Sequence, residues 1–575
     1  MAISSSLPQD RRAWAEWAAI LLVFVLHGAW PVPEVNEPYY LGKAIHFWNP
    51  GWVGEDFFLD SSDTHTVFYL SIGWLSLLLP PTAMAWSGRL MVWGLMAWAW
   101  QRLSWAVLPR PWWSVLSAAL LVCLNERCHM AGEWIVGGVE AKGLAFVAMF
   151  LGLEALVRGR WNLVWTLFGL SAMFHVLVGG WAVVAAAFAW LLFAGESFGR
   201  KRPEGDTADR AAPSGGEAAD DGAVPSLRAM LPGLLLGGLL SLPGLIPSLM
   251  LTWNVDSETV RQANIIYVYH RLPHHLDPLS FPEHFVRRFM LLSLLWTVLA
   301  WQLRRVAGQR RMAAFVLGSL LLAAVGAAIA LFGRGDPGTT AGLLRFYWFR
   351  TSDVAVPLAV ALGGTARLAV GLRRGSEWGG APIGELHPAA VRIAGSIALG
   401  VAIFHVGGYA LLRTQPVVPR ADRLPAYGSW KLACRWIADE ENVPADARFL
   451  TPRLNQTFKW YTARSEVVTM KDIPQDAHSI VAWWARLEDV YGTGSRDPYE
   501  RWHRCLADVE PQRLRRLGEK YDAQYVLTFV RPPLPMLRVY ANRVYAVYQL
   551  EGELPAADEQ NIPPDHSDER GPGEP

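Results

Sequence analysis

Charged and aromatic residues that could do chemistry are concentrated between Pro31 and Thr66, directly after the first apolar segment. The carboxylates, histidines and aromatic residues of this acidic stretch are Glu34, Glu37, Glu55, Asp56, Asp60, Asp63, His46, His65, Tyr39, Tyr40, Trp48 and Trp52. Partial burial against aromatic rings raises the pKa of a carboxylate toward the range in which it can take a proton from a hydroxyl group. Glu37 is therefore a candidate general base, with a solvated loop glutamate as the alternative.

Three aspartates in this stretch, Asp56, Asp60 and Asp63, are spaced by four and three residues. On a helix this spacing would place them on one face, where they could be solvated or could hold a divalent cation through oxygen ligands. Asp56 and Asp60 are also candidates to assist Glu37 as catalytic carboxylates. His65 begins the next apolar stretch, where it could contact a lipid phosphate or cap a helix.

Polar side chains also occur near the ends of later apolar segments. Arg89 lies about two turns inside its segment, Glu140 and Lys142 open another, and His175 closes a third. A charge inside a bilayer is costly unless it is paired or faces a polar cavity, so these residues are candidates to bind a polar substrate at one membrane face. The alternatives are that Arg89 reaches the interface, that Glu140 pairs with Lys142, and that His175 packs against Trp181.

Two later groups add candidates for binding phosphate or sugar. A histidine-rich loop contains His274 and His275, and its prolines exclude a simple metal-binding helix face. Arg345 and Arg350 flank an aromatic run and could grip a phosphate in bidentate fashion, with an Arg350–Asp353 ion pair as the structural alternative. The full set of candidate binding residues is Tyr39, Tyr40, Asp63, His65, Arg89, Glu140, Lys142, His175, His274, His275, Arg345 and Arg350.

Several classes of function have no support in the sequence. There is no P-loop, dinucleotide-binding fingerprint or nucleophilic serine or cysteine motif. The formal net charge of +1 does not favour nucleic acid as a partner. The four cysteines lack zinc-site spacing, so no metal centre is predicted, although Cys434 and Cys505 could form a disulfide.

The elements that must position these residues are membrane helices. The chain has 575 residues, of which 52% are hydrophobic and 18% charged. Its apolar runs predict about 11 spanning helices with basic residues at the turns of one face, which places the N-terminus inside and the C-terminus outside. The predicted spans are 14–30, 83–107, 112–125, 140–157, 161–175, 179–193, 227–251, 285–303, 312–332, 346–368 and 391–412.

The expected fold class is a polytopic α-helical membrane protein with a small C-terminal α/β domain outside the membrane. Residues 1–413 form the membrane domain, with the acidic outer loop at 31–66, an interfacial helix at 67–80, a disordered cytoplasmic loop at 200–226 and an outer loop at 252–285. Residues 414–552 form the soluble domain and 553–575 a disordered tail. A polar cluster in the soluble domain is interpreted as surface: Lys459, Tyr461, Arg464, Lys471 and Asp472.

Two motifs in this order of elements resemble the GT-C superfamily of membrane glycosyltransferases, which includes protein O-mannosyltransferases, aminoarabinose transferases and oligosaccharyltransferases, and uncharacterised bacterial members in particular. Glu37-Pro38-Tyr39-Tyr40 is similar to the acidic and aromatic element of the first outer loop in that superfamily. Ser87-Gly88-Arg89-Leu90 is similar to the arginine-containing start of the following span. Many relatives have Asp-Glu where this sequence has Asn36-Glu37, so Asp56 or Asp60 stays an alternative to Glu37 as the base.

The resemblance implies inverting transfer of a sugar from a polyprenyl-phosphate donor to a glycan, lipid or protein acceptor, at the outer face of a bacterial cytoplasmic membrane. A carboxylate would deprotonate the acceptor, and cationic side chains would hold the departing phosphate. No cofactor is expected, with a divalent cation as the alternative because oligosaccharyltransferases need one. The rival interpretations are a transporter or flippase and a catalytically inactive scaffold that binds lipid or protein. Transporters usually carry charges near mid-membrane and inverted repeats, whereas here the charges gather at the outer ends of the helices.

Overall fold

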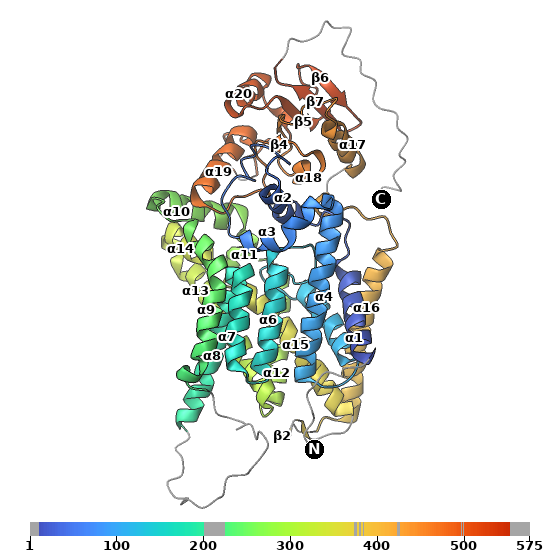
Figure 1. The fold of residues 1–575 in the computed structure, drawn as a ribbon, viewed down its shortest axis with the longest axis vertical. Helices are drawn as coiled ribbons and strands as arrows, with labels where there is room; N and C mark the ends of the chain where they lie inside the picture. The colour runs from blue at the N-terminus through green and yellow to red at the C-terminus, as the bar shows by residue number, and fades with distance from the viewer. Residues whose placement is uncertain are drawn as a thin grey trace, which may run out of the picture.

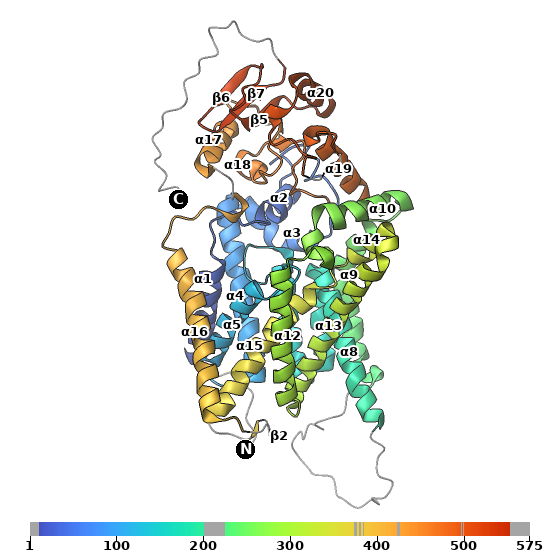
Figure 2. The ribbon, with the colours of Figure 1, turned by 180° about the vertical axis from the view of Figure 1, so that it is seen from behind.

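The structure is a computed structural model that describes residues 11–199, 225–372, 377–378, 381–382, 385–422, 426–495, 497 and 499–551. Long helices stand side by side in a bundle, and the C-terminal region (residues 426–551) covers one end of it (Figures 1 and 2). The start of α1, the end of α8 and the start of α9 lie at the opposite end of the bundle (Figure 1). This relative placement agrees with the predicted topology, while the face that meets the cytoplasm stays a prediction.

Every predicted span contains a helix of the bundle. These helices are α1 (Arg11–Gly28), α4 (Pro81–Val107), α5 (Trp113–Arg127), α6 (Ala141–Val157), α7 (Trp161–Phe174), α8 (Val176–Gly199), α9 (Leu227–Met250), α12 (Glu283–Leu303), α13 (Ala307–Phe332), α15 (Arg350–Leu372) and α16 (Pro388–Leu412). Within the described ranges, six are long and apolar enough to cross a bilayer: α8, α9, α12, α13, α15 and α16. The chain is therefore a multi-pass membrane protein, and the count of about 11 spans stays a prediction.

The outer faces of the bundle helices suit a lipid environment. On α9, Leu231, Leu235 and Leu239 follow one another at helical spacing and are 50%, 65% and 64% exposed. An apolar stripe of this kind is unfavourable in water and favourable against lipid tails. On the inner side, α7 and α9 pack backbone to backbone, since a Cβ atom on Gly237 would lie 2.3 Å from the carbonyl oxygen of Trp165.

Short helices fill the space between the bundle and the C-terminal region. The acidic stretch contains α2 (Glu37–Trp48), a helix that the sequence did not predict. The predicted interfacial helix at 67–80 is shorter than expected: α3 (Thr66–Ile72) is followed by the 3-10 helix η1 (Gly73–Leu77). The three aspartates lie in turns and share no helix face. The cause is local, because Asp56 Oδ1 accepts hydrogen bonds from the backbone N–H groups of Phe58 and Leu59, which stabilises a turn.

The predicted outer loop is mostly helical. It holds α10 (Ser257–Ile265), the π-helical η2 (Ile266–Arg271), α11 (Pro273–Leu276) and the 3-10 helix η3 (Pro278–Ser280). Its neighbours before α15 are η4 (Gly333–Gly335) and α14 (Pro337–Leu344), and a short pair of strands, β1 (Glu377–Trp378) and β2 (Ala381–Pro382), precedes α16. Asp256 starts α10 as its N-cap by accepting a hydrogen bond from the Thr259 N–H.

The C-terminal region is a mixed sheet covered by helices. The strands are β3 (Arg448–Leu450), β4 (Ser465–Glu466), β5 (Tyr525–Phe529), β6 (Arg538–Ala541) and β7 (Tyr545–Gln549), and the helical elements are η5 (Arg420–Asp422), α17 (Tyr427–Ala438), α18 (Phe458–Thr462), α19 (Ala477–Tyr491), η6 (Leu506–Asp508) and α20 (Pro511–Tyr521). The strand order is β4-β3-β5-β7-β6, parallel among the first three strands and antiparallel for the rest. This agrees with the α/β class expected for the region.

Two expectations about this part of the chain need comment. Cys434 and Cys505 are free, because they are buried in two different hydrophobic clusters of the C-terminal region, so the suggested disulfide does not form. Ser226, assigned to the disordered loop, caps the start of α9. The rest of that loop up to residue 224, and the predicted tail, lie outside the described residues.

Candidate functional site

A cavity of about 150 Å³ lies where the bundle, its outer loops and the C-terminal region meet. The middle of the predicted outer loop, the start of α2 and the segment before α19 contribute to its wall. The polar and aromatic residues that line it are Asn36, Tyr39, Tyr40, Glu133, Trp134, Glu140, Lys142, Tyr267, Arg271, His275, Tyr347, Arg350, Lys471 and Gln475. The cavity therefore collects side chains from segments that are far apart in the sequence.

Two cations of the cavity share one carboxylate. Glu133 Oε2 accepts a hydrogen bond from Arg350 Nε at 2.6 Å, and its Oε1 lies 2.9 Å from Lys142 Nζ. Burial would raise the pKa of Glu133, but Arg350 and Lys142 lower that pKa to about 2. Glu133 therefore stays ionised and holds the two cations in place, and the Lys142 ammonium also lies 3.9 Å from the centre of the Trp134 ring.

Two other cations in the cavity have no carboxylate partner. Among the residues that the structure describes, Arg271 and Lys471 form no ion pair, and the buried Nε of Arg271 has no hydrogen-bond partner. Burial lowers the pKa of the Arg271 guanidinium, and burial followed by repulsion from Arg271 lowers the pKa of Lys471 to about 8. A buried cation without a partner is unfavourable, so the cavity has the electrostatics of a site for an anion.

Glu140 is the carboxylate of the cavity that is suited to proton transfer. It directly precedes α6, and its Oε1 accepts a hydrogen bond from Asn36 Nδ2 at 2.8 Å, whereas Lys142 is 3.5 Å from its other oxygen. Burial raises the pKa of Glu140, and the attraction of Lys142 offsets this only in part. A buried carboxylate with a raised pKa at the edge of a polar cavity can act as a general base.

Glu37, the residue first considered as the base, is outside the cavity lining. Its two oxygens accept hydrogen bonds at 2.6 Å from Arg89 Nε and Nη2, and at 3.0 and 2.7 Å from the backbone N–H groups of Val139 and Glu34. Glu37 and Arg89 are both 0% exposed. With every acceptor position used and no path to solvent, the pair serves to join α2 to α4, and the geometry gives Glu37 no substrate hydroxyl to deprotonate.

The three aspartates also have partners of their own outside this cavity. Asp63 lies 3.3 Å from Lys43 Nζ and accepts a hydrogen bond from the Tyr69 hydroxyl at 2.5 Å. Asp60 is 2.9 Å from His46 Nε2 and lines a different pocket of about 310 Å³ on the C-terminal region. Because each aspartate is turned toward a different partner, they do not form a shared cation site.

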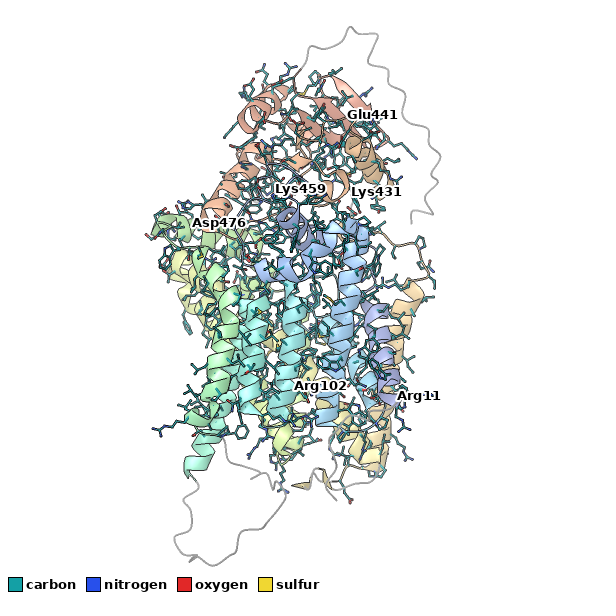
Figure 3. All side chains as sticks on the ribbon, in the orientation of Figure 1. Arg11, Arg102, Lys431, Glu441, Lys459 and Asp476 are labelled. Carbon is teal, nitrogen blue, oxygen red and sulfur yellow. The ribbon has the colours of Figure 1, made fainter. Side chains whose placement is uncertain are left out.

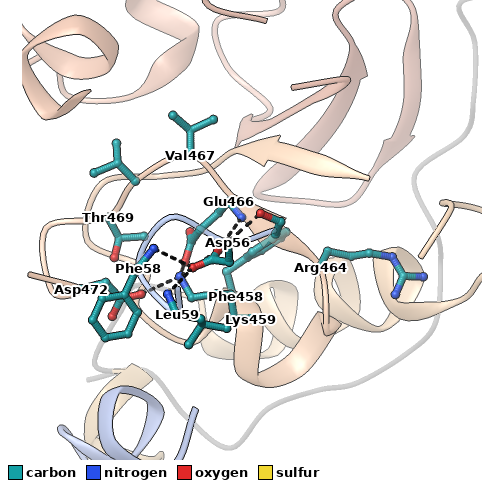
Figure 4. A network of polar contacts seen from close by, with 12 residues as sticks. Asp56, Phe58, Leu59, Phe458, Lys459, Arg464, Glu466, Val467, Thr469 and Asp472 are labelled. Atoms are coloured by element: carbon teal, nitrogen blue, oxygen red, sulfur yellow. Dashed lines mark hydrogen bonds and ion pairs between the residues drawn. The ribbon is translucent and has the colours of Figure 1, made fainter. Parts of the chain in front are cut away.

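Asp56 instead joins a buried network around Lys459, at the junction between the acidic stretch and the C-terminal region (Figures 3 and 4). Lys459 Nζ lies 2.6 Å from Asp472, 2.7 Å from Glu466 and 3.7 Å from Asp56. The polar cluster predicted to lie on the surface is therefore partly buried, because Lys459 lies in the interior between three carboxylates. Burial, opposed by Lys459, raises the pKa of Glu466 to about 7.

Replacing Glu466 with Gln is expected to stabilise the protein increasingly as the pH rises. The folded chain holds a proton on Glu466 up to a pKa of about 7, against an ordinary value of 4.5, so the parent loses stability across this window while the Gln variant does not. Melting temperatures of both proteins in one detergent between pH 5 and 8 measure this difference. Glu519→Gln, at an exposed position of α20, is the control, and a pH-independent gain in Glu466→Gln would contradict the assignment.

Of the predicted histidines, His275 lines the cavity, whereas His175 and His65 lie behind the lining residues. His275 lines the cavity, donates a hydrogen bond from Nδ1 to the Ala131 carbonyl, and has its pKa lowered by burial to about 3, so it is neutral near pH 7. His175 Nε2 lies 3.0 Å from Arg350 Nη1, and the His65 ring lies between His175 and Tyr40, tilted against both rings. These two histidines support the wall without lining the cavity.

Four expectations about this wall fail. His274 is exposed and contacts the His275 ring at a tilt, and Arg345 donates a hydrogen bond to Asn264 at 2.6 Å outside the cavity. Arg350 pairs with Glu133 because Asp353 is occupied by the N–H groups of the loop before α6. The packing of His175 against Trp181 is replaced by its contact with Arg350, since Trp181 stacks on Trp348.

Sequence reasoning missed Glu133, Arg271 and Lys471 as members of the site. Arg271 lies in the histidine-rich loop, where only the neighbouring histidines were predicted to bind a ligand. Lys471 stood in the C-terminal region, 121 positions beyond Arg350 in the numbering, and no local pattern distinguishes it from a surface lysine. Arg271 could have been found from its position, because it lies between Tyr267 and Pro273 and close to the candidates His274 and His275.

Comparisons with known proteins cover the chain unevenly. Residues 428–490, which run from α17 to α19 and include Lys459 and Lys471, match the model of a domain of unknown function, DUF6798. No curated protein matches the chain. Among solved structures, the archaeal oligosaccharyltransferase AglB from Archaeoglobus fulgidus, in complex with an inhibitory peptide and a dolichol-phosphate, is similar with a TM-score of 0.45 and 12% identity, over 90% of this chain and 69% of that chain.

Proposed function

We propose that this protein is an integral membrane glycosyltransferase that moves a sugar from a polyprenyl-phosphate donor to an acceptor. The reaction would take place at the membrane face covered by the C-terminal region. The observation that carries the proposal is the pair of unpartnered cations, Arg271 and Lys471, in the cavity at the end of the bundle. A phosphate group supplies the negative charge and the acceptor oxygens that both side chains lack.

The charged residues of the cavity divide the work of this reaction. Glu140 takes the proton of an acceptor hydroxyl, whose oxygen attacks the anomeric carbon of the donor sugar from the side opposite the phosphate. The bond between that carbon and the phosphate oxygen breaks, and the electron pair leaves with the polyprenyl phosphate. Arg271 and Lys471 stabilise the charge that develops on the phosphate, and Arg350 is held beside them by Glu133.

The geometry does not require a metal ion in the cavity. Lys142 Nζ lies 2.9 Å from Glu133 and 3.5 Å from Glu140, so an ammonium group already occupies the place between the two carboxylates. We therefore expect transfer without a divalent cation and without another cofactor. The acceptor, which could be a glycan, lipid or protein, and a bacterial cytoplasmic membrane as the location stay part of the proposal.

The proposal is tested with the full chain in lipid nanodiscs and a panel of polyprenyl-phosphate sugars. Release of polyprenyl phosphate, followed by mass spectrometry, is the expected result, and Glu140→Gln should lower its rate by about 100-fold or more while the donor still binds. Glu258→Gln changes an exposed glutamate of α10 and is the matched control. A parental rate in Glu140→Gln would remove Glu140 from the mechanism, and donor binding without release by the parent would favour the inactive scaffold.

The affinity for the donor is expected to depend on the protonation of Lys471. The donor is a phosphodiester whose charge is constant near neutrality, whereas Lys471, with a pKa lowered to about 8, loses its charge as the pH rises. Affinity should therefore be constant below about pH 7 and fall about tenfold per pH unit above about 8. Binding isotherms from pH 6 to 10 measure this fall. Lys471→Arg should remove it, and an unchanged slope in that variant would contradict the role of Lys471.

A further inference from the structure

Three side chains with metal-binding atoms meet where α1, α5 and α16 pack together. His27 lies in the last turn of α1, Glu126 near the end of α5, and His405 on α16. The helix α16 stands at the edge of the bundle in both views (Figures 1 and 2). None of the three residues lines the cavity described above.

The three side chains lie close enough to share one ion. His27 Nδ1 lies 3.2 Å from His405 Nε2, and Glu126 Oε2 lies 3.7 Å from the other ring nitrogen of His405, Nδ1, so an ion would use one of these two nitrogens. One ligand atom from each residue can be chosen so that all three are within 4.8 Å of one another. Two nitrogens bound to the same tetrahedral zinc ion are about 3.3 Å apart, given Zn–N bonds of about 2.0–2.1 Å.

The cluster also leaves buried polar atoms without partners. His405 is 3% exposed, and its Nδ1 and the Oε2 of Glu126 have no hydrogen-bond partner within the part of the chain that the structure describes. The buried residues of α16 are Val391, Ala402 and His405. His405 is therefore the polar side chain on a packing face whose other buried residues are small and apolar. Such a group is unfavourable there unless something binds it.

We propose that His27, Glu126 and His405 form a binding site for a divalent transition metal ion, with Zn²⁺ as the fitting ion. Two imidazoles and one carboxylate are a known zinc ligand set, and they leave a fourth position for water. The Tyr409 hydroxyl donates a hydrogen bond to Glu126 Oε1 and would orient the carboxylate as an outer partner.

The nearby arginines do not occupy this position. Arg413 donates hydrogen bonds to the carbonyl oxygens of Leu26 and His27, and Arg420 pairs with Glu34 at 3.1 Å. The Glu126 carboxylate is thus available to offset the charge of an ion. An ion bound here would fix α16, the helix that leads into the C-terminal region, to α1 and α5.

The test uses the purified full chain, stripped with a chelator and then exposed to Zn²⁺. We expect one Zn²⁺ per chain by mass spectrometry of the metal and a higher melting temperature with Zn²⁺ present. His27→Ala and His405→Ala should each weaken the affinity at least tenfold, whereas His478→Ala, an exposed histidine on α19, should bind as the parent does. Co²⁺ in place of Zn²⁺ should give the visible absorption of a tetrahedral site.

The proposal is overturned if the chelator-stripped parent takes up no Zn²⁺ or if the His27→Ala and His405→Ala variants bind Zn²⁺ as tightly as the parent. Should either histidine variant fail to elute as a single species, Glu126→Gln replaces it, because the Glu126 side chain is 34% exposed and tolerates exchange. In that case the Co²⁺ spectrum of Glu126→Gln decides whether the site binds the ion. Loss of the tetrahedral absorption in Glu126→Gln supports the site, and an unchanged spectrum refutes it.

Discussion

Replacing Arg271 with Ala is expected to lower the affinity for polyprenyl phosphate, and the transfer rate with it, by about 100-fold. The guanidinium is half-buried in the cavity, forms no ion pair with any carboxylate in the described part of the chain, and has a buried Nε that is available to donate a hydrogen bond to an anion. Removal of one positioned donor to a developing charge lowers a rate by about 100-fold to 1000-fold. Lys471→Ala should act in the same direction, and the double variant should bind too weakly for the donor to be detected by native mass spectrometry.

The control for this prediction is Arg261→Ala. Arg261 belongs to the adjacent helix α10, is 49% exposed on its side chain and pairs with Glu258, so its removal tests the general charge of the loop. Binding of the donor should be unchanged in this variant. If Arg271→Ala and Arg261→Ala bind the donor equally well, the cavity is not the anion site, and the proposed function loses the observation on which it rests.

Replacing Arg89 with Met is expected to destabilise the protein by about 3–5 kcal/mol, because the variant leaves the fully buried carboxylate of Glu37 without a cation. Glu37→Gln should also destabilise the protein, since its single amide oxygen can accept from only one of the N–H groups of Val139 and Glu34, and Arg89 loses its anionic partner. Melting temperature and yield of monodisperse protein measure both effects. The double variant Glu37→Gln with Arg89→Met should recover part of the loss, because the uncompensated charge is then gone.

Arg102→Met is the comparison for this pair. Arg102 also forms an ion pair, with Glu154 at 3.0 Å, but its side chain is 33% exposed, so water replaces part of the lost interaction. The destabilisation should be clearly smaller than that of Arg89→Met. Equal effects of the two variants, or a normal melting temperature combined with lost transfer in Glu37→Gln, would restore Glu37 as the catalytic carboxylate.

The elements of the bundle were predictable because their signal is local. A run of apolar residues such as 227–251 needs no partner to be recognised, and α9 occupies almost the same residues. The α/β class of the C-terminal region was predictable in the same way, because apolar runs such as Tyr525–Phe529 are typical of buried strands. The helix α2 was hidden by the charged residues that surround it in the sequence.

The membrane face at which polar residues gather was also readable from the sequence. Basic turns on one side and acidic or histidine-rich loops on the other predicted that Tyr39, Tyr40, Glu140, Lys142 and Arg350 would approach one another, and all five line the cavity. The roles within that group were not readable. Whether a carboxylate is a base or half of an ion pair depends on which cation lies within a few ångström, and that cation is usually remote in the sequence.

The sequence by itself determined that this chain is a membrane protein of many helices with an α/β region at its end, because hydrophobic length and alternation are properties of consecutive residues. Only the tertiary structure decided that Arg89 neutralises Glu37, that Lys459 gathers Asp56 and Glu466, and that Arg271 and Lys471 have no carboxylate partner among the described residues. The physical reason is that electrostatic pairing depends on distance in space and on burial. The carboxylates of the acidic stretch between Pro31 and Thr66 therefore serve mainly to hold the fold together. The cations proposed to bind the substrate phosphate, Arg271 and Lys471, come from other segments of the chain.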